Sequence, residues 1–289
     1  MKIFPSAHHL GARIEGLDLS KPLSTQQRDE IIQLLGKYGL LNFSGQQLEA
    51  ADLKHFSSHF GELEINVANA YQEPGHPEVM ILSNMVVDGK PVGIADAGQG
   101  WHTDMSYSRT VAFANVLYGI RIPHRNGRPL GGTTFSDMQA AYDELPETMK
   151  LQLEGLTGLH DYAKFYDMMR NEKNSPRPPL TDAQRSAKPP VSHPIVLTHP
   201  ITKRKVLYAN PGYTIRINEL SEQESEKLLT FLFEHQVQDR FVYTFEWTPG
   251  DVLIWDNLRT IHQAYPDYTA DEHRLIKRCQ VMATLFDIP

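Results

Sequence analysis

The feature that most restricts the fold is a succession of strand patterns over residues 241–286, with a turn at Pro249-Gly250-Asp251. Strand patterns also occupy residues 112–122 and 191–217. A few helical patterns lie between them, at residues 24–36, 53–60, 137–156 and 221–235. Many strands with a few helices predict a mainly β fold with flanking helices, a barrel or cupin-like jelly roll with the helices packed outside.

The composition excludes several classes of function. The net charge is −7, and no basic stripe or zinc-finger spacing appears, so we expect no nucleic-acid partner. No apolar run is long enough to span a bilayer and no signal peptide is evident, so we expect a cytoplasmic protein without a membrane partner. The single Cys279 excludes an intramolecular disulfide. The 289 residues are expected to form one domain over residues 1–289.

A histidine and an acid stand two positions apart in Trp101-His102-Thr103-Asp104-Met105. The aromatic and β-branched neighbours favour a strand or its rim, and side chains two apart on a strand point to the same side. His102 and Asp104 would then be presented together. One imidazole and one carboxylate make two-thirds of a 2-His-1-carboxylate triad, which is the usual ligand set of non-haem Fe(II). An exposed strand pair is the alternative for these two residues taken alone.

His262 is the candidate for the third ligand. The chain has 13 histidines, and His262 differs from most of them in its neighbours. A turn and the buried strand that ends in Trp255-Asp256-Asn257 precede His262. The mouth of a barrel would place a ligand there. For the remaining histidines, a structural or surface role is expected.

Two arginines follow His262 on one face of an otherwise apolar strand. In Arg274-Leu275-Ile276-Lys277-Arg278, the alternation of a strand places Arg274 and Arg278 on the same side. A buried guanidinium must be paired, and a structural salt bridge would explain one arginine. Two arginines near a candidate metal ligand fit carboxylate binding better. Gly131-Gly132-Thr133-Thr134 offers a hydroxyl to the same carboxylate.

The chain resembles the taurine dioxygenase family of Fe(II)/2-oxoglutarate-dependent dioxygenases, and the resemblance spans nearly its whole length. The segments that carry it are Trp101-His102-Thr103-Asp104, Gly131-Gly132-Thr133-Thr134, Trp255-Asp256-Asn257 with His262, and Arg274 with Arg278. The resemblance implies a double-stranded β-helix, that is, a jelly roll. It also implies Fe(II), 2-oxoglutarate and O2 as cofactor and co-substrates, and a homo-oligomer, either a dimer or a tetramer.

The resemblance also implies roles for individual residues. His102, Asp104 and His262 would bind Fe(II). Arg274, helped by Thr134, would hold the distal carboxylate of 2-oxoglutarate. Arg278 would bind the acidic group of the substrate.

The substrate pocket is less constrained by the sequence. We expect Arg278, Tyr107, Asn66, Asn69 and Tyr166 to line it, with a lid or insert around residues 160–192. Asn66, Asn69 and Gly98 stand where taurine dioxygenases have a His, a Tyr and an Asn, so taurine itself is not the expected substrate.

The predicted reaction is hydroxylation of a C–H bond in a small anionic molecule, with release of succinate and CO2. The candidate substrates are a sulfonate, an aryloxyalkanoate or an amino-acid-like acid. One alternative is desaturation or another oxidation with the same cofactors in a biosynthetic pathway. Another is a non-catalytic protein that binds 2-oxoglutarate or metal. A cupin-type isomerase with a different metal would leave Arg274 and Thr134 without a role.

Overall fold

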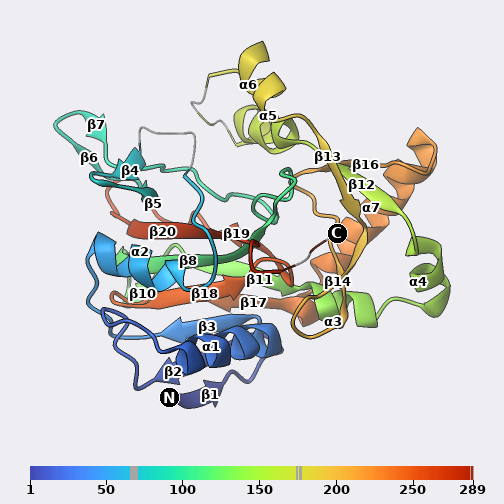
Figure 1. The fold of residues 1–289 in the computed structure, drawn as a ribbon. Coiled ribbons are helices and arrows are strands. Elements are labelled where there is room, and N and C mark those ends of the chain that lie inside the picture. Colours follow the sequence, from blue (N-terminus) through green and yellow to red (C-terminus); the bar gives the residue numbers. More distant parts are fainter. Residues whose placement is uncertain (66–70, 174, 176–177, 287, 289) are drawn as a thin grey trace.

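The computed structural model describes residues 1–65, 71–173, 175, 178–286 and 288. Within these residues, eight strands form a large sheet in the order β1-β2-β3-β18-β8-β20-β5-β4 (Figure 1). All neighbours in this sheet are antiparallel except β2 and β3, which are parallel. The strands are β1 Lys2–Pro5, β2 Ala12–Glu15, β3 Leu40–Phe43, β4 Gln72–Glu73, β5 His76–Ser83, β8 Ala112–Arg121, β18 Val252–Asp256 and β20 Leu275–Met282.

A smaller antiparallel sheet packs against one face of the large sheet. Its order is β17-β11-β19, with β17 at Val242–Phe245, β11 at Thr133–Asp137 and β19 at Thr260–Ala264. Phe135 and Trp255 meet between the sheets with ring centroids 5.2 Å apart. Two antiparallel sheets that enclose an apolar layer make a jelly roll. The mainly β fold predicted from the sequence is confirmed.

The remaining described strands lie outside the two sheets, with β12, β13 and β16 on one side and the β6-β7 hairpin on the opposite side (Figure 1). One three-stranded sheet has the order β13-β12-β16, and three pairs of strands form hairpins. The bounds are β12 Thr157–His160, β13 Val191–Pro194, β16 Thr214–Ile217, β6 Val86–Val87, β7 Lys90–Pro91, β9 His124–Arg125, β10 Arg128–Pro129, β14 Val196–Thr198 and β15 Lys205–Leu207.

Helices flank the strands, as predicted. Figure 1 shows α1 and α2 beside the large sheet, α5 and α6 at the top of the view above β20, and α3, α4 and α7 on the side that holds β12, β13 and β16. The bounds are α1 Thr25–Tyr38, α2 Ala50–Ser58, α3 Met138–Asp143, α4 Glu147–Leu153, α5 Tyr162–Glu172, α6 Asp182–Ala187, α7 Glu222–Gln236 and a 3-10 turn at Asp239–Phe241. The pattern at residues 137–156 is two helices, with Pro146 as the N-cap of the second.

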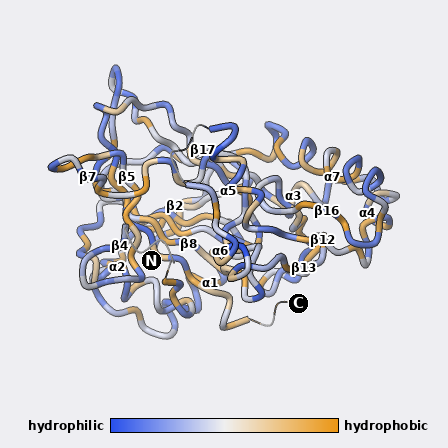
Figure 2. Tube along the Cα trace, turned by 90° about the horizontal axis from the view of Figure 1, so that it is seen from above, coloured by the Kyte–Doolittle hydropathy of each residue, from blue (hydrophilic) through white to orange (hydrophobic). Residues whose placement is uncertain are grey.

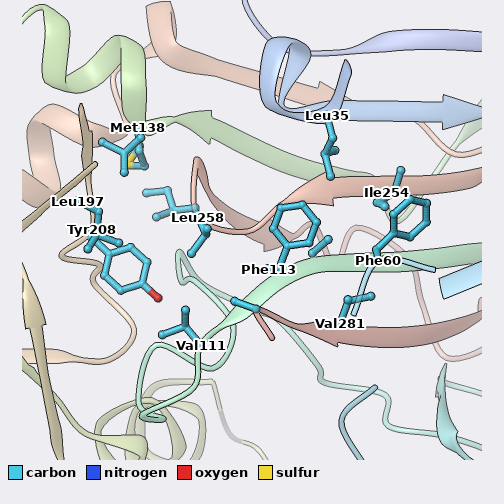
Figure 3. Packing of buried hydrophobic residues seen from close by; sticks show 14 of the residues in the cluster. Leu35, Phe60, Val111, Phe113, Met138, Leu197, Tyr208, Ile254, Leu258 and Val281 are labelled. Carbon is cyan, nitrogen blue, oxygen red and sulfur yellow. The ribbon is translucent and has the colours of Figure 1, made fainter. Parts of the chain in front are cut away.

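The large sheet is covered on both faces, which explains why β8 reads as a nearly continuous apolar run. One buried cluster lies on the helical face (Figure 3). It contains Leu35 of α1, Ile254 of β18, Phe113 of β8, and Phe60, which follows α2. Along the trace, hydrophobic residues gather on the central strands and hydrophilic ones on the outer loops (Figure 2). Each fully buried aliphatic or phenyl side chain of such a layer contributes about 1.5–3 kcal/mol.

Local signals fix the ends of α1. Ser24 and Gln27 form a capping box at its start. The helix is followed by Gly39, whose φ is +73° and whose missing side chain leaves room for Leu10. Strand β3 begins at the next residue and therefore enters the sheet beside β18.

Candidate active site

The two histidines predicted as metal ligands are joined through their backbones. His102 N–H donates to the His262 carbonyl at 3.0 Å, and His262 N–H donates to the His102 carbonyl at 2.8 Å. This single antiparallel bridge attaches the segment to β19. Residues 101–105, predicted as a strand or the rim of one, make only this one bridge, because the chain turns after it and Met105 has a φ of +58°. The turn, and not strand alternation, brings Asp104 beside His102.

The side chains of His102, Asp104 and His262 converge on one point. One ligand atom from each lies within 4.8 Å of the others. Nε2 of His102 is 3.6 Å from Oδ1 of Asp104, and Nε2 of His262 is 3.7 Å from Oδ2. All three residues are buried. Within the described part of the chain, no other group of three potential ligands converges in this way.

The charge states of these groups suit a divalent metal. Burial lowers the pKa of His262 to about 3, so its imidazole is neutral at pH 7. Nδ1 of His102 donates to the Gly100 carbonyl at 2.8 Å, which leaves Nε2 with a free lone pair. Burial raises the pKa of Asp104, but Arg278 and the two histidines outweigh it and hold this pKa well below its usual range. Two imidazoles and one carboxylate are the ligand set of non-haem Fe(II).

Asn257, directly after β18, holds the backbone of Asp104. Its Oδ1 accepts from the Asp104 N–H at 3.2 Å, and its Nδ2 donates to the Asp104 carbonyl at 2.8 Å. The preceding Asp256 is buried and accepts from Nε2 of His199 at 2.8 Å. The Trp255-Asp256-Asn257 motif therefore anchors the loop that carries the carboxylate ligand.

Arg274 directly precedes β20 and is only 6% exposed. Its Nε donates to the Gly131 carbonyl at 3.1 Å. Among the described residues, no acidic group lies within ion-pair distance of it. Burial lowers the pKa of Arg274, which reflects the cost of desolvating its charge. A buried guanidinium without an acidic partner fits a carboxylate supplied by a ligand.

Thr133, and not the predicted Thr134, faces the cavity that contains Arg274. Thr134 lies on the opposite face of β11, where its hydroxyl is 3.1 Å from that of Thr244. Thr133 shares its face with Phe135, whose ring stacks near His262. Successive side chains on a strand point to opposite faces, so only one of the two adjacent threonines can point into the cavity.

A second cavity of about 480 Å³ adjoins the first, and Arg278 lines both. Nη1 of Arg278 is 3.4 Å from Oδ2 of Asp104. The predicted Tyr107 and Tyr166 also line this larger cavity. The predicted Asn66 and Asn69 lie outside the described residues.

Phe165 and Tyr213 are aromatic residues of the larger cavity that were not predicted and that lie close to His102. The ring centroid of Phe165, on α5, is 4.9 Å from that of His102. The ring centroid of Tyr213, just before β16, is 6.2 Å from that of His102. Tyr213 also contacts Tyr107, at 4.7 Å. The available signal was the spacing of Phe165 and Met169, which places both on the buried side of α5. The helix lies within the segment predicted as a lid or insert, and its movement stays a prediction.

A jelly roll that joins two imidazoles, a carboxylate and an unpaired buried guanidinium defines the class of Fe(II)/2-oxoglutarate-dependent oxygenases. The family model "Taurine catabolism dioxygenase TauD, TfdA family" matches residues 2–280, and the chain belongs to this family. It is therefore an Fe(II)/2-oxoglutarate-dependent dioxygenase that uses O2. No helix in the described part of the chain is both long and apolar enough to cross a membrane.

Relatives in this family differ in their substrates. The 2,4-dichlorophenoxyacetate dioxygenase of Cupriavidus pinatubonensis is 34% identical over 264 residues, which cover 87% of this chain and 88% of the relative. Pentalenolactone F synthase of Streptomyces avermitilis is 30% identical over 291 residues, which cover 97% and 92%. A crystal structure of AAD-2 in complex with Mn(II) and N-oxalylglycine has a TM-score of 0.81 at 29% identity, with 98% of each chain covered.

Proposed function

We propose that this protein hydroxylates a C–H bond of a small anionic organic molecule and releases succinate and CO2. Sulfonates, aryloxyalkanoates and amino-acid-like acids are the candidate substrates. Fe(II) and 2-oxoglutarate, when bound, activate O2 for this oxidation. The observation that carries the proposal is Arg278, a guanidinium that lines both cavities and lies beside the carboxylate of Asp104.

The residues present fit both groups that the chemistry needs. His102, Asp104 and His262 would hold Fe(II), because their free ligand atoms converge and their protonation states are suitable. Arg274 and the hydroxyl of Thr133 would hold the distal carboxylate of 2-oxoglutarate. The absence of an acidic partner for Arg274 among the described residues supports this assignment.

The balance of charge supports an anionic substrate. Near the three ligands, Arg274 and Arg278 carry two positive charges against the one negative charge of Asp104. The charges of Fe(II) and of the 2-oxoglutarate dianion cancel. Around the metal ligands alone, one positive charge therefore remains, beside Arg278, and a monoanion bound there would neutralise it. Asp96, whose carboxylate accepts from the hydroxyl of Ser175, adds one negative charge to the larger cavity, so the support for an anionic substrate is local to Arg278.

The aromatic residues would orient the apolar part of the substrate. Phe165 and Tyr213 pack against His102, and Tyr107 packs against Tyr213. Such a wall excludes water from the reacting C–H bond and leaves the anionic group to Arg278. The expected substrate therefore has an apolar body next to its acidic group.

A substrate panel with two strand variants tests the proposal. Fe(II) and 2-oxoglutarate are bound without oxygen, oxygen is admitted with each acid, and succinate and the product mass are measured. Hydroxylation adds one oxygen atom, whereas desaturation removes two hydrogens.

For the accepted acid, Arg278→Met should raise KM about 10- to 100-fold, because a charge-assisted hydrogen bond contributes about 1.5–3 kcal/mol. Lys277→Met is the matched control, since Lys277 points to the other face and pairs with Glu73 at 2.9 Å. Equal KM values for Arg278→Met and the wild type would contradict an anionic substrate.

A further inference from the structure

Gln280 is a buried amide in the wall of the larger cavity. It lies two residues after Arg278 on β20, so both side chains point to the same face. It is only 5% exposed. A carboxamide has a donor end and an acceptor end. Which end faces the cavity decides which group of a substrate Gln280 can bind.

Backbone groups fix the orientation of the first amide in a chain of three. Asn257 contacts the Asp104 N–H, which is always a donor, so the contacting atom of Asn257 is its oxygen. It also contacts the carbonyls of Asp104 at 2.8 Å and Ala112 at 3.0 Å, which are always acceptors, so the atom there is its nitrogen. The amide of Asn257 therefore cannot be reversed without the loss of these bonds.

The orientation passes from Asn257 through Asn115 to Gln280. Because Oδ1 of Asn257 accepts, the atom of Asn115 that lies 3.3 Å from it must be the donor Nδ2. Oδ1 of Asn115 is then the acceptor for Gln280, whose Nε2 donates to it at 3.1 Å. Asn115 and Gln280 are direct partners across β8 and β20. Reversal of Gln280 would set two oxygens against each other and cost about 1–3 kcal/mol.

We propose that Gln280 is a specificity-determining residue that presents its carboxamide oxygen to the substrate. Its Oε1 accepts a hydrogen bond from a hydroxyl, ammonium or amide N–H group of the substrate. Among the described residues, none donates to this oxygen. The inference rests on the proposed function, because Arg278 binds the anionic group at the same time. The substrate therefore carries an acid and a hydrogen-bond donor roughly 7 Å apart, which is the spacing of side chains two positions apart on a strand.

Matched pairs of acids that differ only in the donor test this inference. The probes are 4-hydroxyphenylacetate with 4-fluorophenylacetate, and 6-hydroxyhexanoate with hexanoate. Each is titrated calorimetrically into the Mn(II)- and 2-oxoglutarate-loaded protein without oxygen. In the wild type, the hydroxyl member should bind about tenfold more tightly, which is the effect of one net hydrogen bond. In Gln280→Met the ratio should fall to about one, whereas Ile94→Val, in the same cavity wall, should weaken both members equally.

Equal binding of both members of a pair by the wild type would overturn the inference. Failure of every acid to bind would contradict the proposed anionic substrate but would not test Gln280. In that case, NMR measures the orientation of the Gln280 carboxamide directly. A scalar coupling across the hydrogen bond from Nε2 of Gln280 to the carboxamide carbon of Asn115 supports the inference. No such coupling, with Gln280 amide protons that exchange as fast as those of exposed amides, overturns it.

Discussion

Replacement of Arg274 with methionine should weaken 2-oxoglutarate binding strongly and leave the fold nearly as stable as before. The buried guanidinium would pair with the distal carboxylate, and removal of one partner of a buried ion pair costs about 3–5 kcal/mol. The dissociation constant of 2-oxoglutarate should therefore rise about 150- to 5,000-fold. Without the ligand, the guanidinium of Arg274 donates to the Gly131 carbonyl, contacts the side chain of Tyr268 and carries a desolvated charge. The variant loses these contacts but no longer buries a charge, and the two effects offset each other. The change in unfolding free energy should therefore stay within about 1 kcal/mol.

Arg259 provides the matched comparison, because it is buried to a similar degree but fully paired. Its Nε is 3.1 Å from Oδ1 of Asp137, and its Nη1 donates to the carbonyls of Gly36 and Lys37 at 2.9 Å. Arg259→Met would leave the buried Asp137 carboxylate without its partner. This variant should lose about 3–5 kcal/mol of stability and keep its affinity for 2-oxoglutarate.

The two variants are compared by two measurements. Titration calorimetry of 2-oxoglutarate into the Mn(II)-loaded protein gives the affinity, and urea unfolding of the metal-free protein gives the stability. We expect Arg274→Met to lose affinity for 2-oxoglutarate but not stability, and Arg259→Met to lose stability but not affinity. If Arg274→Met is as unstable as Arg259→Met and still binds 2-oxoglutarate normally, Arg274 is a structural residue and the assignment is wrong.

Two further predictions concern the loop that carries Asp104 and the buried histidine of β12. Asn257→Ala should lower the affinity for Mn(II) about 10- to 100-fold, because groups that orient a metal ligand have effects of this size; Asn218→Ala, which removes an exposed amide, should leave the affinity unchanged. Burial lowers the pKa of His160 from 6.5 to about 3, so the unfolded chain binds the proton first and wild-type stability should fall as the pH drops from 6.5 toward 3. This contribution is about 1.4 kcal/mol per pH unit and should be missing in His160→Asn; parallel stability profiles of the two proteins would contradict it.

The sequence contained enough to predict the three converging ligands, although part of the reasoning was wrong. His102 and Asp104 were expected to converge through strand alternation, but a backbone bridge to His262 and a turn at Met105 bring them together. Such a turn has no marker in the local residue pattern, since Met rarely takes a positive φ. The convergence is fixed by Asn257, which is distant in sequence.

Side-chain direction was the main source of error elsewhere. Arg274 directly precedes β20 and Arg278 lies on it, and both line the first cavity, as the alternation of a long apolar strand predicts. At the start of β11 the glycine pair gave no such alternation, and Thr134 was chosen in place of Thr133. Phe165 and Tyr213 reach the cavity from elements whose packing on the jelly roll depends on tertiary contacts. The chain of amides from Asn257 to Gln280 joins residues from three distant segments and could not be predicted from any one of them.

The most direct test of the whole account is a crystal structure of the protein grown without oxygen in the presence of Mn(II) and 2-oxoglutarate. We expect one metal ion bound by Nε2 of His102, Nε2 of His262 and the carboxylate of Asp104, with the distal carboxylate of 2-oxoglutarate against Arg274. A metal ion bound elsewhere, or 2-oxoglutarate bound away from Arg274, would contradict the assignment of this site.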